Sequence, residues 1–453
     1  MNRESPQGAS APPRQIGFWI ALALVVGNMI GSGIFLLPAN LAPYGANAVV
    51  GWVVTIAGAL CLAAVFGELA RAMPDASGPY DYVHSGLGRA PAFFVMWSYW
   101  ISIWVTNAAI SIAAVSYLSS LAPAAFSAPG VAAVAAIGFV LLFTAVACSG
   151  ARTSGGVQLV TSVIKVLPLI AAVVIAAMVL GRGDQPAQFA PTPLAASGVA
   201  GAAALTLWAM LGFECAAVPA SRVRDPQRNI PRATLIGTLA VGLIYLTASS
   251  AIFLLLPAYV AAKSSAPFAD LVGRFWGSTA ATAVVFFAAV SCLGALNGWV
   301  LLQGEVPLAL ARRGVFPSWF GTVNRRGMPV RAQLLGSAFA VGLIAANYTR
   351  GLTELFGFMA LLATVASLVL YLFAAISALR LMGLRQLRRG TFAAVAALGT
   401  VFALWAFYGA GAEATGWGAV LLATGIPVYF LMRRASTTPA AEARPAAPRE
   451  AAS

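Results

Sequence analysis

Long apolar runs alternate with short polar connections along almost the whole chain. Most runs hold about 20 apolar residues, the length that an α-helix needs to cross the hydrocarbon core of a bilayer. The pattern therefore predicts an all-α, multi-pass membrane protein with twelve transmembrane helices. We expect these helices at residues 16–37, 47–70, 92–117, 131–148, 157–180, 197–219, 233–256, 279–303, 332–347, 352–376, 391–409 and 416–432. They form one domain over residues 16–432, with a cytoplasmic tail at 1–15 and a disordered one at 433–453.

Composition agrees with this pattern and narrows the class. The 453 residues are 60% hydrophobic and only 9% charged, and the mean hydropathy of +0.86 lies far above that of a soluble globular protein. The four cysteines lack metal-ligand spacing and imply no disulfide framework. The sequence also contains no paired carboxylates, metal cluster or phosphate-binding loop. We therefore expect neither an enzyme nor a cofactor.

The distribution of positive charge predicts the orientation. With the N-terminus in the cytoplasm, 22 of the 27 lysines and arginines fall on the cytoplasmic side. Cytoplasmic loops carry such an excess, so both termini are expected in the cytoplasm. The net charge of +14 then reflects membrane anchoring and attraction to anionic lipid, and nucleic acid is not an expected partner.

The first apolar run is interrupted at its centre by the sequence Asn28-Met29-Ile30-Gly31-Ser32-Gly33. Glycine weakens a helix by about 1 kcal/mol relative to alanine. Inside a membrane, backbone groups freed from a helix are tolerated only where they face protein, water or a ligand. The stretch therefore predicts a broken helix that lines a cavity, or else a close helix contact through small residues.

The sixth run contains a second interruption, where Gly212 lies between Trp208 and Glu214. The two interrupted runs are five spans apart, and this odd offset predicts an inverted repeat of about 16–180 and 197–376, with the last two helices outside it. The third and eighth runs correspond as well, because each carries a mid-membrane asparagine near a tryptophan. These pairs are Asn107 with Trp104 and Asn297 with Trp299.

Two ionisable residues lie at membrane depth, Lys165 in the fifth run and Glu214 in the sixth. Such residues are expensive in hydrocarbon and are functional candidates by default. The competing interpretation of Lys165 is structural: its ammonium would hold the carbonyls freed near Gly27 and Asn28. Two tyrosines, Tyr99 and Tyr371, are candidate gating residues, although plain packing would explain them equally well.

Together these residues resemble the amino acid–polyamine–organocation transporters, and within them the basic amino acid/polyamine antiporters of the arginine/agmatine type. The resemblance runs from about residue 16 to residue 371. It rests on Gly31-Ser32-Gly33, on Trp208, Gly212 and Glu214, on Arg224-Asp225-Pro226 with Asn229-Ile230-Pro231, and on Gly298-Trp299. It implies a twelve-helix, LeuT-like fold with a five-plus-five inverted repeat and broken first and sixth helices.

The resemblance also implies roles for individual residues. Backbone groups around Met29, Ser32 and Gly33 would hold the substrate carboxylate, and carbonyls near Met29, Trp208 and Leu211 its α-amino group. Asn28 would also belong to the binding site. Trp299 would stack on the cationic end, with Asn107 hydrogen-bonding beside it. The gates would be Tyr99, Trp208 and Tyr371, and Glu214 would respond to pH.

Two departures from the arginine/agmatine antiporter pattern leave the identity of the substrate undecided. Where arginine/agmatine antiporters offer small hydroxyls to the guanidinium, this chain has Ala295 and Ala363, and only Ser367 remains. Lys165 instead resembles proton-coupled members of the superfamily. The expected function is an amino acid/amine exchanger that works by alternating access. The alternative is a proton-coupled symporter or exporter of neutral amino acids. Protons and a second copy of the chain, in a homodimer, are further candidate partners.

Overall fold

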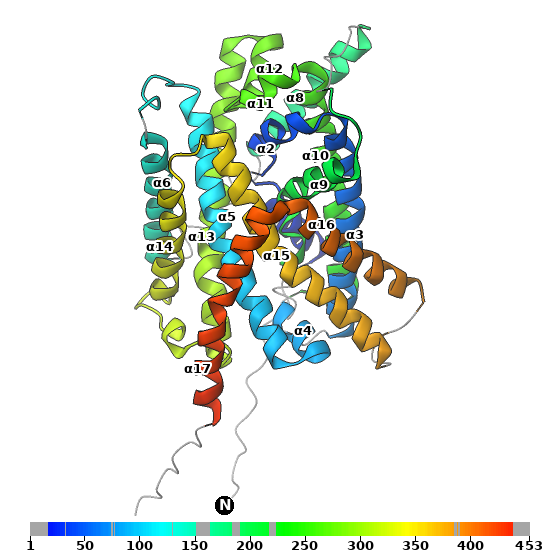
Figure 1. The fold of residues 1–453 in the computed structure, drawn as a ribbon, viewed down its shortest axis with the longest axis vertical. Helices are drawn as coiled ribbons and strands as arrows, with labels where there is room; N and C mark the ends of the chain where they lie inside the picture. Colours follow the sequence, from blue (N-terminus) through cyan, green and yellow to red (C-terminus); the bar gives the residue numbers. More distant parts are fainter. Residues whose placement is uncertain are drawn as a thin grey trace, which may run out of the picture.

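The computed structural model describes residues 17–437, except 32, 74, 75, 77, 129, 151–163, 184–190, 217–222, 385, 386, 388 and 389. Every element named within these ranges is a helix, which confirms the all-helical class (Figure 1). In chain order the elements are α1 (Phe18–Met29), α2 (Gly33–Leu41), η1 (Ala42–Tyr44), α3 (Ala46–Ala72), α4 (Pro79–Leu87), α5 (Arg89–Ser119), α6 (Val131–Ser149), α8 (Leu167–Gly181), α9 (Ala196–Met210), η2 (Phe213–Ala216), α10 (Pro226–Leu255), α11 (Ala258–Lys263), α12 (Pro267–Trp276), α13 (Ser278–Arg312), η4 (Ser318–Gly321), α14 (Val330–Ala346), α15 (Leu352–Gly383), α16 (Thr391–Ala423) and α17 (Gly425–Thr437).

Seven helical segments in the described ranges are long and apolar enough to cross a membrane, and the bent pair of α1 and α2 makes eight. Three shorter apolar helices, α8, α9 and α14, coincide with expected spans. The eleventh and twelfth expected spans fall in one continuous segment, 391–433, which Gly411 divides with its non-helical φ of 80°. The count of twelve stays a prediction.

Several helices extend beyond the lengths that their apolar runs predict. The clearest case is α10, which begins at Pro226, ahead of the expected start at residue 233. Proline suits the first turn of a helix, because its missing N–H would have no partner there and its φ is already helical. The polar first turn of α10 therefore carries no hydrophobic signal but is still helical.

Two helix breaks lie against each other in the middle of the bundle. The first separates α1 from α2, whose axes differ by 43°. The second follows α9, where Gly212 takes a φ of 110° that favours glycine. A side-chain Cβ placed on Gly212 would lie 3.2 Å from the backbone carbonyl carbon of Asn28, and one on Gly33 would lie 3.0 Å from the Cα of Ala209. Both glycines thus permit a backbone approach that larger residues would prevent.

The remaining helices surround these breaks. The long helix α5 is the most enclosed candidate span, and α13 and α15 pack along it. The helices α3 and α10 pack against each other, α10 also packs on α1, and α3 also packs on α9. In Figure 1, α11 and α12 lie at one end of the bundle and α4 lies at the other.

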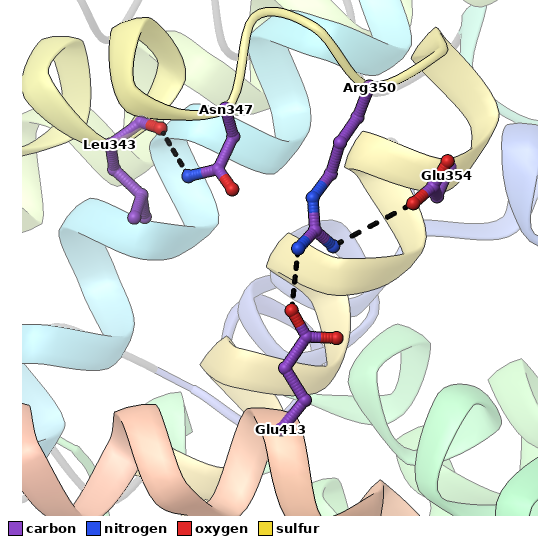
Figure 2. Close-up of polar contacts among 5 residues, drawn as sticks. All are labelled: Leu343, Asn347, Arg350, Glu354 and Glu413. Atoms are coloured by element: carbon purple, nitrogen blue, oxygen red, sulfur yellow. Dashed lines mark hydrogen bonds and ion pairs between the residues drawn. The ribbon is translucent and has the colours of Figure 1, made fainter.

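An ionic cluster ties the start of α15 to the kink of α16 (Figure 2). The Nη2 atom of Arg350 lies 2.5 Å from Oε1 of Glu413, and its Nη1 atom lies 3.9 Å from Oε1 of Glu354. Beside it, Asn347 closes the end of α14 by donating from Nδ2 to the carbonyl oxygen of Leu343 at 3.0 Å. The cluster fixes two segments that are far apart in the sequence.

Candidate functional site

A small cavity lies where the two helix breaks meet. Its walls come from α1 and α2, from α5, from α9 and from α13. The lining residues are Asn28, Met29, Gly31, Gly33, Thr106, Ile110, Trp208, Ala209, Leu211 and Trp299. Six of the residues expected at the binding site are therefore brought together: Asn28, Met29, Gly33, Trp208, Leu211 and Trp299. Ser32, which was also expected there, lies outside the described residues.

The cavity volume is about 20 Å³, which is room for about one water molecule. An amino acid would therefore require the walls to move apart. The indole of Trp208 is the largest candidate for such movement, and it packs edge to face against Phe356 of α15 with ring centroids 5.0 Å apart. Its Nε1 donor has no hydrogen-bond partner in the part of the chain that the structure describes. This conformation is closed around the site.

Side chains from the surrounding helices hold the carbonyls at the end of α1. The ammonium of Lys165, only 1% exposed, donates to the carbonyl oxygen of Gly27 at 2.9 Å. The hydroxyl of Tyr245 on α10 donates to the carbonyl oxygen of Met29 at 2.7 Å. The geometry is the one that the bracing interpretation of Lys165 requires. A carbonyl oxygen has two lone pairs, so Met29 retains one acceptor position for a substrate.

The other ionisable residue, Glu214, lies behind the second break and does not line the cavity. Both candidate gating tyrosines donate to its carboxylate: Tyr99 to Oε1 at 3.3 Å and Tyr371 to Oε2 at 2.9 Å. The backbone N–H of Gly212 also donates to Oε2, at 3.1 Å. Phe213 stacks on the ring of Tyr371 with centroids 4.8 Å apart. The structure thus joins the two candidate gating tyrosines to the buried carboxylate.

Two of the expected binding residues, Asn107 and Ser367, are buried but do not line the cavity. Asn107 donates from Nδ2 to Oε1 of Gln303 at 2.8 Å. Ala295 and Ala363 depart from the antiporter pattern. Ala295 lies beside the first break, where a Cβ placed on Gly31 would be 3.4 Å from the Cβ of Ala295. Ala363 is fully buried in α15.

Comparison with known proteins decides the class. Residues 16–432 match the family model described as amino acid permease. The chain belongs to the amino acid permease family. This permease is accordingly a multi-pass membrane transporter and not an enzyme. The expected membership of the amino acid–polyamine–organocation superfamily is thereby confirmed.

Curated relatives of the permease cover most of its length. The cadaverine/lysine antiporter of Escherichia coli (strain K12) is 34% identical over 88% of this chain and 90% of its own. A Bacillus subtilis (strain 168) protein, provisionally named an arginine/ornithine antiporter, is 33% identical over 81% of this chain and 84% of its own. The putrescine transporter of Haemophilus influenzae is 28% identical, covering 93% of this chain and 97% of its own.

Several residues at the permease site could not be identified from the sequence. Thr106, Ile110 and Phe356 are ordinary members of apolar runs, and nothing in those runs indicates which face of each helix meets the cavity. Tyr245 is separated from its partner Met29 by 216 positions. The position of Tyr245 in the middle of an expected span did indicate that its hydroxyl would have a partner, because a buried hydroxyl normally has one.

Proposed function

We propose that this permease exchanges a basic amino acid for an amine across the inner membrane by alternating access. The observation that carries the proposal is the cavity itself. Trp208 and Trp299 line it together with backbone from both broken helices. Broken helices at the midpoint of a transporter bind the charged ends of small substrates, and an indole face is the best aromatic partner for a cation. The names of the relatives agree with such a substrate class.

Within this proposal, each end of the substrate has its own partners. The N-terminal end of α2, around Gly31, Ser32 and Gly33, would hold the carboxylate through backbone N–H groups and the helix dipole. Carbonyls of Met29, Trp208 and Leu211 would receive the α-amino group. The cationic side chain would lie on the indole of Trp299, with Asn107 beside it.

Alternation between the two sides would involve the same residues as gates. Trp208 closes the cavity against Phe356, and Tyr99 and Tyr371 converge on Glu214. We place these residues in a domain of twelve spans over 16–432 that contains the inverted repeat, with both termini in the cytoplasm. We assign proton coupling to Lys165 and pH response to Glu214.

Three substrate pairs follow from this chemistry: arginine with agmatine, lysine with cadaverine, and ornithine with putrescine. Ala295 and Ala363 favour the last two. A guanidinium has five N–H donors to satisfy, against three for an ammonium. Each buried donor without a partner loses about 1–3 kcal/mol. In the proposed substrate complex, methyl groups at Ala295 and Ala363 in place of hydroxyls therefore disfavour arginine more than lysine or ornithine.

Counterflow in liposomes tests the proposal. Purified permease is reconstituted with unlabelled lysine, ornithine, arginine, their three decarboxylated amines, leucine or alanine inside. Uptake of each labelled compound is then followed. We expect fast exchange only among basic amino acids and amines. Efficient exchange of leucine or alanine, with basic compounds inactive, would overturn the proposal in favour of a neutral amino acid carrier.

A further inference from the structure

A buried chain of polar side chains connects four helices next to the cavity. It runs from Asn107 on α5 to Gln303 on α13, then to Ser337 on α14 and Thr144 on α6. None of these four side chains is more than 3% exposed. Buried polar groups in membrane proteins keep fixed partners, because no water is available to replace one. The partners therefore determine which group donates and which accepts in each of these hydrogen bonds.

The order is set at the Thr144 end. The Thr144 hydroxyl donates to the carbonyl oxygen of Val140 at 2.7 Å, and a carbonyl can only accept. Its single proton is then committed, so in the 2.5 Å contact with Ser337 it is Ser337 that donates. With its own proton used, Ser337 accepts from Nε2 of Gln303 at 2.9 Å.

The proton order then fixes both amides. The Nε2 end of Gln303 also donates to the carbonyl oxygen of Gln333 at 2.9 Å, so both neighbours at that end are acceptors. Its other end, Oε1, therefore faces Asn107, which must present Nδ2 to it. An amide can otherwise be turned over without a change of shape. The Oδ1 atom of Asn107 is left buried, with no hydrogen-bond partner among the residues described.

The fixed amide lies beside the cavity. Asn107 is flanked along α5 by Thr106 and Ile110, which both line the cavity, and Gln303 lies about one helical turn after Trp299 on α13. We propose that Gln303 is a positioning residue that holds Asn107 with its acceptor oxygen available to the cationic end of the substrate. Ammonium and guanidinium groups donate to such an oxygen. A methyl group leaves it unpaired, and a carboxylate repels it.

This inference deepens the proposed function and rests on it. The competing explanation is that the chain of side chains only ties four helices together. The two explanations differ in selectivity, because a purely structural tie would affect all substrates alike. Orientation of Asn107 would instead affect only substrates with a donor at the far end of the side chain.

The test compares two variants with the same change of side chain. Gln303→Met removes the acceptor that orients Asn107. Gln333→Met is the matched control, since Gln333 is equally buried and its backbone carbonyl stays in place. Binding of lysine, arginine and norleucine to the full-length protein in nanodiscs is measured by calorimetry. Norleucine has the carbon chain of lysine without the terminal ammonium. The readout is the affinity for the better basic ligand divided by that for norleucine.

We expect Gln303→Met to lower this ratio about tenfold, the loss of one hydrogen bond to a charged group, while norleucine affinity stays within about twofold. Gln333→Met should leave the ratio unchanged. If a Gln303→Met protein still binds norleucine and its affinity ratio is unchanged, the inference is overturned while the proposed function stands. The same holds if the affinity ratio falls equally in Gln333→Met. If Gln303→Met does not fold, Gln303→Leu takes its place with the same criteria, because it also removes the Oε1 acceptor of Asn107. If the unmodified permease does not prefer a basic ligand, the proposed function fails, and the inference fails with it.

Discussion

The ammonium of Lys165, just before the start of α8, lies 2.9 Å from the carbonyl oxygen of Gly27 in α1 and donates a hydrogen bond to it. Gly27 is in the last turn of α1, where helix carbonyls lose their intrahelical partners. The lysine therefore supplies a donor that the broken helix needs. Lys165 belongs to a different part of the chain, so one ammonium group connects the break in α1 to the segment that precedes α8.

Replacing this lysine should affect stability and coupling together. Lys165→Met removes the donor and should lower the free energy of unfolding by about 1–3 kcal/mol, because the carbonyl of Gly27 loses its partner. If Lys165 also carries the coupled proton, uptake driven by a pH gradient is abolished while exchange persists in part. Thermal unfolding and liposome flux measure the two effects. Lys263→Met, at an exposed position in α11, is the control and should change neither.

Other outcomes separate the two roles of Lys165. Under a purely bracing role, binding and exchange fail together in Lys165→Met. Sodium-dependent uptake by the unmodified protein would contradict the coupling role, and so would gradient-driven accumulation that survives the substitution.

Glu214 is a buried acceptor for three donors, and this arrangement predicts different results for two substitutions. Glu214→Gln can keep its oxygen on the Gly212 N–H and the Tyr371 hydroxyl, while its NH₂ group donates to Tyr99, whose hydroxyl can also accept. We expect this variant to fold normally but to lose the pH dependence of transport. Glu214→Leu removes the acceptor of all three hydrogen bonds, and each lost bond costs about 1–3 kcal/mol.

The comparison needs both a stability and a transport measurement. Thermal unfolding should rank Glu214→Gln near the unmodified protein and Glu214→Leu well below it. Exchange rates are then recorded between about pH 5 and pH 8. A Glu214→Gln protein with an unchanged pH profile would remove Glu214 from the pH response.

The helix breaks and their proximity could be predicted because the sequence marks them directly. Gly31, Gly33 and Gly212 interrupt apolar runs that would otherwise be continuous, and the odd offset of the two runs predicts an inverted repeat whose matching breaks point to a binding site. Lys165 was equally visible, because a cation in an apolar run requires a partner. These signals are local, and each has a physical cost that only a special environment offsets.

The partners of the binding residues were not predictable in the same way. In a membrane helix, residues that face lipid and residues that face protein are both apolar, so the sequence does not indicate how each helix is rotated. Asn107 illustrates the consequence. Its Nδ2 donates to Gln303, 196 positions away, and nothing in the sequence indicates that partner. The contact of Tyr245 with Met29 was missed for the same reason.

The indole of Trp299 should discriminate between cationic and neutral substrates. It lines the cavity at 7% exposure. A cation over an aromatic face gains about 0.5–2 kcal/mol, so Trp299→Leu should weaken binding of a basic amino acid by that amount and norleucine by less. Calorimetric titration measures both. Trp276→Leu, on the half-exposed side chain at the end of α12, is the matched control. Equal losses for both ligands would argue against a cation at Trp299.

If Trp299 does hold the cation, hydroxyls introduced at Ala295 and Ala363 should raise the affinity for arginine selectively. Ala295→Ser, beside the first break, and Ala363→Ser each add an acceptor for a guanidinium N–H. We expect the affinity for arginine to rise relative to that for lysine in the double variant. A rise for both ligands, or for neither, would place the cationic end elsewhere.

The distribution of arginines predicts which loops face the outside. Tyr259→Cys, at a side chain that is 73% exposed in α11, should react with an impermeant thiol reagent in intact cells. Gln227→Cys, at an exposed position in the first turn of α10, should react only after the membrane is opened. The native cysteines are replaced beforehand so that only the introduced thiol reports. The reverse labelling pattern would overturn the cytoplasmic placement of both termini.

Arg350 should contribute measurably to stability, whereas one of its two acidic neighbours should not. Its guanidinium contacts Glu413 at 2.5 Å and lies 4.4 Å from the ring centroid of Phe358, but it reaches Glu354 only at 3.9 Å (Figure 2). The Glu413 and Glu354 side chains are 56% and 69% exposed, so solvent screens both charges, and the shorter contact of Glu413 is what favours it. We therefore expect Arg350→Met to lower the free energy of unfolding by about 1 kcal/mol and Glu413→Gln by somewhat less.

Glu354→Gln, by contrast, should change the unfolding temperature very little, and it serves as the matched control for Glu413→Gln. Both substitutions remove one carboxylate that faces the same guanidinium, but only Glu413 joins α15 to the segment beyond the kink at Gly411. High salt should reduce the difference between the two variants, because partly exposed ion pairs are screened within a few ångströms at about 1 M. Equal destabilisation by both variants, at low and at high salt, would show that Arg350 does not act through Glu413.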